Sequence, residues 1–62
     1  MADIYEDIGA IMGELEADEM IIESMILNGK NERVNRKLQE AATEIKHALS
    51  DLSDALFDAT VS

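Results

Sequence analysis

The stretch VNRKLQEAATEIKHALSDLSDALFDA, residues 34–59, decides the fold. Its apolar residues recur every three or four positions, which is the spacing of one face of an α-helix. That face consists of Val34, Leu38, Ala42, Ile45, Leu49, Leu52, Leu56 and Ala59. No proline interrupts the stretch, and Asn31 is a good N-cap. The sequence therefore predicts one long helix over about residues 31–60.

Small residues form a second row on this helix. Ala41, Ala48 and Ala55 recur every seven residues beside the apolar stripe, and side chains this small let an antiparallel helix approach closely. The first half of the chain has a comparable row at Gly9, Gly13 and Ala17, and we expect it to allow the same close helix packing.

The first half of the chain also has helical periodicity. Its stripe contains Ile4, Ile8, Ile11, Leu15, Ile22 and Met25 and skips one position, at Asp18. Asp3 followed by Glu6 has the form of a capping box, and Gly29 is suited to the left-handed conformation that often ends a helix. We expect a helix over about residues 3–28.

A connection of only two residues, 29–30, makes the two helices antiparallel neighbours within a single domain, residues 1–62. The fold class is therefore all-α, an antiparallel helical hairpin. Facing residues then have numbers with a constant sum, and a sum near sixty brings the two apolar stripes together. The same register places Glu14 beside Lys46 and Glu23 beside Lys37, which are opposite charges.

A hairpin of 62 residues without cysteine has little to stabilise it alone. Apolar groups also surround the end of the first helix, and one partner helix cannot cover so much of its circumference. These residues are Met20, Ile21, Met25, Ile26 and Leu27. We expect a homo-oligomer, most simply a four-helix bundle or a larger one. The alternative is that the same surface docks a different protein or a partner helix.

Asp18 breaks the first stripe, because a carboxylate at a core position is costly unless it is paired or solvated. Three interpretations compete. Asp18 reaches a base such as Lys37 or Lys46 and fixes the register of the helices. Alternatively the bundle is open or bent at Glu16–Glu19, which leaves Asp18 in water. In the third interpretation Asp18 belongs to a functional site.

Charge limits the classes of partner. Fourteen acids and five bases give a net charge of −9, which argues against direct binding to nucleic acid or to an anionic membrane. No segment is long and apolar enough to cross a bilayer, and no basic region precedes an apolar run as in a signal peptide. These features predict a cytoplasmic protein. Its 47% hydrophobic content is too high for a disordered acidic tail.

The acidic residues predict the kind of function. Carboxylates at positions i and i+4 of a helix lie about 6 Å apart along its axis, close to the spacing of phosphates on one DNA strand. The row in question consists of Glu40, Glu44, Asp51, Asp54 and Asp58. We expect a small interaction module that binds a basic protein surface and inhibits or modulates its partner, as antitoxins, anti-repressors, phage inhibitors and nucleic-acid mimics do. The alternative is a scaffold or chaperone-like hairpin that grips a partner helix through the apolar end of its first helix.

No pattern predicts catalysis or a cofactor. The sequence has no nucleophile with its base, no glycine-rich phosphate loop and no zinc-site spacing. Glu44 and His47 have the Glu-x-x-His spacing of di-iron bundles, but Ile45 takes the core position, so both point outward. We expect neither an enzyme nor a metalloprotein.

Overall fold

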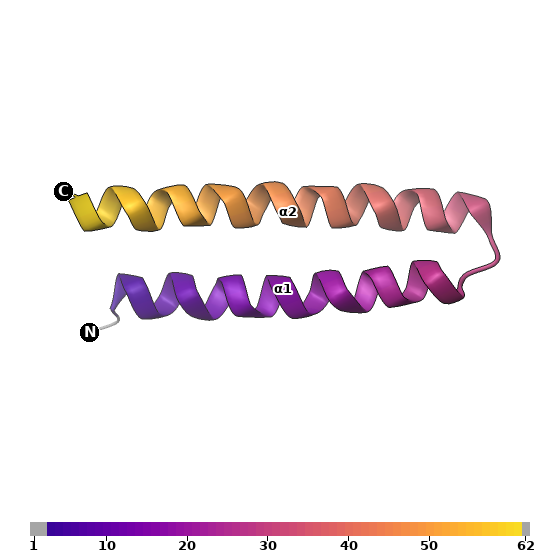
Figure 1. Cartoon of the computed structure of the whole chain (residues 1–62), viewed down its shortest axis with the longest axis horizontal. Helices are drawn as coiled ribbons and strands as arrows, with labels where there is room; N and C mark the ends of the chain where they lie inside the picture. The colour runs from indigo at the N-terminus through magenta and orange to yellow at the C-terminus, as the bar shows by residue number, and fades with distance from the viewer. Residues whose placement is uncertain (1–2, 62) are drawn as a thin grey trace.

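The chain forms two long helices packed side by side. A computed structural model describes residues 3–61, in which α1 spans Ile4–Asn28 and α2 spans Glu32–Val61. The helices run antiparallel, with the two ends of the chain at one end of the molecule and the connection at the other (Figure 1). The Cα atoms extend over 47 × 17 × 14 Å. The predicted helical hairpin is confirmed.

Side-chain caps begin both helices. The Asp3 carboxylate accepts a hydrogen bond of 2.9 Å from the backbone N–H of Tyr5. The Asn31 side chain accepts hydrogen bonds from the N–H groups of Arg33 and Val34, at 3.0 and 3.2 Å. Each cap satisfies N–H groups that have no partner within the first turn of a helix. Asp3 and Asn31 therefore mark the beginnings of the helices, as the sequence predicted.

The expected left-handed conformation of Gly29 is wrong. Gly29 ends α1 in an extended conformation, with φ −81° and ψ 143°. Its need for glycine is spatial, because a Cβ atom here would collide with the side-chain oxygen of Asn35. The amide nitrogen of Asn35 also donates a hydrogen bond of 3.3 Å to the Gly29 carbonyl, so the connection is closed by a side chain of α2.

The contact face of α1 differs from the predicted one. Three residues of the expected stripe, Ile8, Leu15 and Ile22, are buried or half-buried. The other three, Ile4, Ile11 and Met25, are exposed. Three other residues are half-buried instead: Met12, Glu19 and Ile26. Met12 and Ile26 each follow an expected residue by one position, and Glu19 lies in the same heptad row as both. α1 is therefore rotated about its own axis, relative to the expected orientation, by less than the angle between successive residues.

This rotation moves the break in the stripe from Asp18 to Glu19. Asp18 is exposed and does not face Ala42, whereas Glu19 is half-buried. α1 is helical without interruption through Glu16–Glu19, and Asp18 lies in water, as the second interpretation expected. The longer side chain of Glu19 gives a physical reason for the exchange, because its carboxylate reaches the edge of the interface, where Lys46 lies 3.9 Å away.

The register also differs from the expected sum of sixty. The Tyr5 hydroxyl donates a hydrogen bond of 3.0 Å to the carbonyl of Ala59, and Glu19 approaches Lys46. Both contacts join residues whose numbers add to 64 or 65. The expected pairs Glu14–Lys46 and Glu23–Lys37 are therefore wrong. Lys46 contacts Glu19 instead, and Lys37 pairs within its own helix with Glu40.

The interface between the helices is thin. Within residues 3–61 only Ile8 and Ala42 are buried, at 8% and 7% exposure. On α2 the half-buried residues follow the predicted stripe from Leu38 to Ala59. Ten large apolar side chains remain exposed, including Tyr5, Phe57 and Leu27. A single hairpin therefore leaves many large apolar side chains of residues 3–61 in water.

Candidate functional site

One side of the hairpin is polar and carries a groove between the helices. The groove encloses about 500 Å³ near the connection, and Glu23, Gln39 and Lys46 are among its lining residues. These residues belong to heptad rows that flank the interface on each helix. We call this side the polar face: Gly9, Glu16 and Glu23 on α1, and Gln39, Lys46, Ser53 and Thr60 on α2, all of them exposed.

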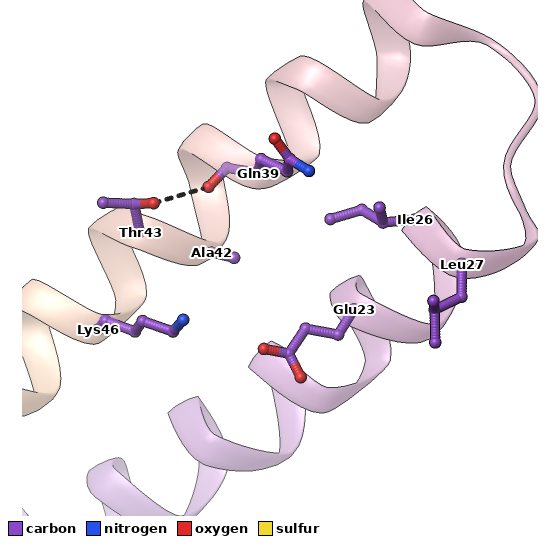
Figure 2. Close-up of a pocket in the computed structure, with 7 residues that line it drawn as sticks. All are labelled: Glu23, Ile26, Leu27, Gln39, Ala42, Thr43 and Lys46. Carbon is purple, nitrogen blue, oxygen red and sulfur yellow. Dashed lines mark hydrogen bonds between the residues drawn. The ribbon is translucent and has the colours of Figure 1, made fainter.

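Figure 2 shows how the side chains lie in this groove. Ile26 points from α1 toward α2, and Leu27 points away from α2. The carboxylate of Glu23 and the amine of Lys46 point toward one another across the groove. The Thr43 hydroxyl donates to the carbonyl of Gln39 at 3.0 Å and so is satisfied within its own helix. The groove is open, shallow and amphipathic.

Glu19 lies at the border between the interface and the polar face. Its side chain is 17% exposed, and its Oε2 atom is buried without a hydrogen-bond partner. The Lys46 amine lies 3.9 Å from that oxygen, beyond hydrogen-bond distance, and the Lys46 side chain is 63% exposed. The pair supplies attraction without a close contact, so the carboxylate is a cost in the hairpin interface.

The opposite side of the hairpin is apolar. Glu23 on α1 and Gln39 and Lys46 on α2 line one groove, so their heptad rows lie on the same side of the hairpin. The rows that flank the interface on the opposite edge of each helix then lie together on the other side. We call this side the apolar face: Ile4, Ile11, Asp18 and Met25 on α1, and Val34, Ala41, Ala48 and Ala55 on α2. Seven of these eight residues are apolar, and only Ala41 and Ala48 are as much as half-buried.

This face was not predicted, although the apolar rows that form it are visible in the sequence. Ile4, Ile11 and Met25 were expected to contact α2, and the alanine row was expected to support the same contact. A heptad count along both helices shows three adjacent apolar rows on each, one more than a two-helix interface can cover. Asp18, the residue expected to break the interface, lies within this face.

The five predicted partner-binding carboxylates all lie on exposed positions of α2. Glu40, Glu44 and Asp51 are joined by Asp54 and Asp58 on the side turned away from α1. Within residues 3–61, one of the five forms an ion pair: Glu40 lies 3.2 Å from Lys37, and both side chains are exposed. A second shallow depression, lined by residues including Arg36, Glu44 and His47, lies on this same side. The structure thus places the five carboxylates on one solvated surface.

The five predicted residues at the end of α1 do not form one patch. Ile26 is half-buried against α2, whereas Met20 and Leu27 are 70% and 86% exposed. Ile21 and Met25 are also exposed but lie toward the apolar face, on the other side of the helix. Apolar side chains therefore lie on several sides of the end of α1, as the sequence predicted, and of these five only Ile26 packs against α2.

The described residues contain neither a cluster of metal-ligand side chains nor a bilayer-spanning helix. Within residues 3–61, no three side chains of the His, Cys, Asp or Glu type gather as a metal site would require. Neither α1 nor α2, as described, combines the length and the apolar character of a bilayer-spanning helix. The surfaces that remain as candidates are the apolar face, the groove and the acidic side of α2.

Comparisons with family models, with curated proteins and with solved structures find no match for this chain. Function must therefore be inferred from the surfaces of the molecule.

Proposed function

We propose that this protein is a non-catalytic interaction module that works as a self-associated helical bundle and binds a basic surface of another protein. The observation that supports binding is the set of five exposed carboxylates on one side of α2. Within residues 3–61 Glu40 pairs with Lys37, and the other four form no ion pair. Clustered, solvated charges of one sign steer and orient a partner of the opposite sign.

Self-association is supported by the thin interface. Two buried residues do not stabilise a 62-residue chain that has no cysteine, and the apolar face offers a further surface to cover. In a four-helix bundle each helix contacts two neighbours and so needs a wider apolar surface than a single contact requires. Three adjacent apolar rows on α1 and on α2 supply that width. Inhibition or modulation of the partner is then the consequence of covering its basic site.

The proposed binding is tested by matched charge neutralisation. One variant converts Glu40, Glu44, Asp51, Asp54 and Asp58 to their amides, and the control converts five exposed acids of α1, namely Glu6, Asp7, Glu14, Glu16 and Glu23. Both variants change the net charge equally. Each is immobilised and exposed to lysate of the source cell, and captured proteins are identified by mass spectrometry. Circular dichroism checks that helicity is kept.

We expect the control to capture the same basic protein as the unmodified chain and the α2 variant to lose it. Capture should also weaken as salt rises, because at roughly 1 M salt the screening length falls to about 3 Å. Equal capture by both variants, or capture that persists at this salt concentration, would contradict the proposed role of the acidic surface.

A second candidate function is a scaffold that grips a partner helix beside the connection. The exposure of Leu27 and Met20, together with the neighbouring groove, favours it. Binding of this kind resists salt and is lost when Leu27 is replaced by serine. If Leu27→Ser leaves a salt-resistant partner bound, this candidate is wrong.

A further inference from the structure

We propose that a second copy of this chain covers the apolar face, with the two α2 helices packed antiparallel about a two-fold axis near Glu44 and Ile45. This inference rests on the proposed self-association and adds to it the surface, the orientation and the register. The observations that carry it are two heptad rows of α2 that share the same centre of symmetry.

The first row is the small-residue part of the apolar face. An antiparallel pair of identical helices places residues opposite one another when their numbers have a constant sum. With a sum of 89, Ala41 faces Ala48 of the second copy, and Val34 faces Ala55. Every contact along this line is then between small or β-branched apolar side chains, which allows the two helices to approach closely.

The second row runs beside the first, on its outer edge. Within α2 it contains Lys37, Glu44, Asp51 and Asp58, and Lys30 precedes it in the connection, so the row is basic at its start and acidic toward its end. A sum of 88 places Lys37 opposite Asp51 of the second copy and brings Asp58 toward the connection that carries Lys30. This centre differs by half a residue from that of the alanine row. Apolar and charge patterns thus specify the same antiparallel register.

Lys37 and Glu44 each have a further charged neighbour in the dimer. Lys37 pairs with Glu40 in the single hairpin, but its side chain is 80% exposed and its ammonium group has three donors, so a second carboxylate can share it. Glu44 meets its own copy at the axis, which makes it the one like-charge contact of the row. Removal of that charge should therefore tighten the dimer.

The charges disfavour the other two-fold arrangement, in which both connections lie at the same end. That arrangement places α1 against α2 of the second copy in the register of the hairpin. The outer row of α1 contains Asp7 and Glu14, which would then lie opposite Asp58 and Asp51. Like charges that face one another across a helix pair are destabilising. The antiparallel arrangement replaces these contacts with lysine–aspartate pairs.

The hairpin plane is large enough for a dimer of this kind. The Cα atoms extend over 47 by 17 Å, which bounds the area that one copy can cover at about 800 Å², and each partner of a standard protein interface contributes roughly that area. With the axis near residue 44, almost the whole of α2 overlaps its copy. In this dimer Asp51 faces Lys37, Asp58 lies toward Lys30, and Glu44 lies against its own copy at the axis, so the acidic surface left for another protein narrows to Glu40 and Asp54.

Disulfide formation tests the register directly, because the chain has no cysteine of its own. We would make Ala41→Cys and Ala48→Cys separately and oxidise each alone and in an equal mixture. The proposed register brings Cys at 41 opposite Cys at 48 of the other copy. Two cysteines at the same position are displaced by about 10 Å along the axis, beyond the Cα separation of about 7 Å that a disulfide tolerates.

We expect rapid formation of the mixed disulfide and slow oxidation of each variant alone, with helicity unchanged. Faster cross-linking of like positions would indicate parallel α2 helices and overturn the proposal. A dimer by sedimentation whose mixture fails to cross-link overturns this face and register but keeps self-association. A monomeric unmodified protein at millimolar concentration overturns self-association as well.

Charge reversal tests the outer row independently. Lys37→Glu and Asp51→Lys should each weaken the dimer by about ten-fold or more in Kd, because two attractive pairs become repulsive. The double variant restores both pairs and should return the Kd to within about three-fold of its original value. Arg36→Glu and Asp54→Lys are the matched controls, since both lie on the side of α2 opposite α1. Equal effects of the controls, or no restoration, would overturn the charge pairing.

Discussion

The two helices of this hairpin have similar lengths but different surfaces. α2 is clearly amphipathic, with one apolar side, six acids and four bases. α1 has apolar residues on several sides, seven acids and no base. The stripe predicted for α2 is the one that packs, and the stripe predicted for α1 is only half correct. Periodicity identifies a contact face when a helix has one apolar side, and it leaves the choice open when several rows compete.

The largest expected effect distinguishes a residue of α1 that packs against α2 from an exposed residue of the same helix. Ile8→Ala should lower the free energy of unfolding by about 2–4 kcal/mol, because Ile8 is buried against α2. Ile21→Ala, at an exposed position of the same helix, should cost less than about 1 kcal/mol. Urea unfolding followed by circular dichroism at one fixed protein concentration measures both. Equal losses would show that α1 has no preferred face.

The next comparison concerns the two adjacent acids of α1. Glu19→Leu should stabilise the hairpin by about 1–2 kcal/mol, because it removes a carboxylate oxygen that is buried without a hydrogen bond. Asp18→Leu should leave the hairpin itself nearly unchanged and tighten self-association, because Asp18 lies on the apolar face. Thermal unfolding and sedimentation, measured for both variants, distinguish these effects. A greater gain in unfolding free energy from Asp18→Leu, at a concentration where both variants are monomeric, would restore the predicted stripe.

The glycines offer a smaller contrast within the same helix. A Cβ atom at Gly9 or Gly13 meets no other atom within 4 Å, so the expected small-residue contact with α2 is wrong at these positions. Gly9→Ala and Gly13→Ala should each stabilise the protein by about 0.5–1 kcal/mol through helix propensity. Gly29→Ala should instead destabilise it, since Asn35 must move. Thermal unfolding measures all three, and a loss of stability for Gly13→Ala would show that another helix covers that side.

The smallest expected effect lies at the open end of the hairpin. Tyr5→Phe removes the hydrogen bond between the start of α1 and the carbonyl of Ala59. Because both groups are exposed, the loss should be about 0.5 kcal/mol or less. Amide exchange of residues near Ala59 should accelerate while exchange near Asn31 stays unchanged. Uniform acceleration along α2 would mean that this contact stabilises the whole hairpin.

The sequence predicted the elements of the fold better than their relative placement. The caps at Asp3 and Asn31 and the antiparallel connection follow from local rules, and all three are present. Register and rotation depend on differences of one residue step between similar apolar rows. Glu14 and Glu23 supplied a plausible but wrong set of charge pairs, because α1 has acids on nearly every side.

The candidate surfaces were predictable in part. The five carboxylates of α2 were placed correctly on a solvated side, because that helix has a single apolar stripe. The apolar face required knowledge of which side of α1 contacts α2, since only then are Ile11 and Met25 seen to be left over. Their exposure is a consequence of tertiary packing, which periodicity within one helix does not contain.

The most direct test of the central claim, that one hairpin is incomplete without a second copy, is the concentration dependence of thermal unfolding. Circular dichroism would follow helicity over about a hundred-fold range of protein concentration. Folding coupled to dimerisation makes Tm rise with concentration, and we predict this rise together with a sedimentation mass of twice 6.8 kDa. A Tm that is independent of concentration, with the mass of one chain, would contradict the account.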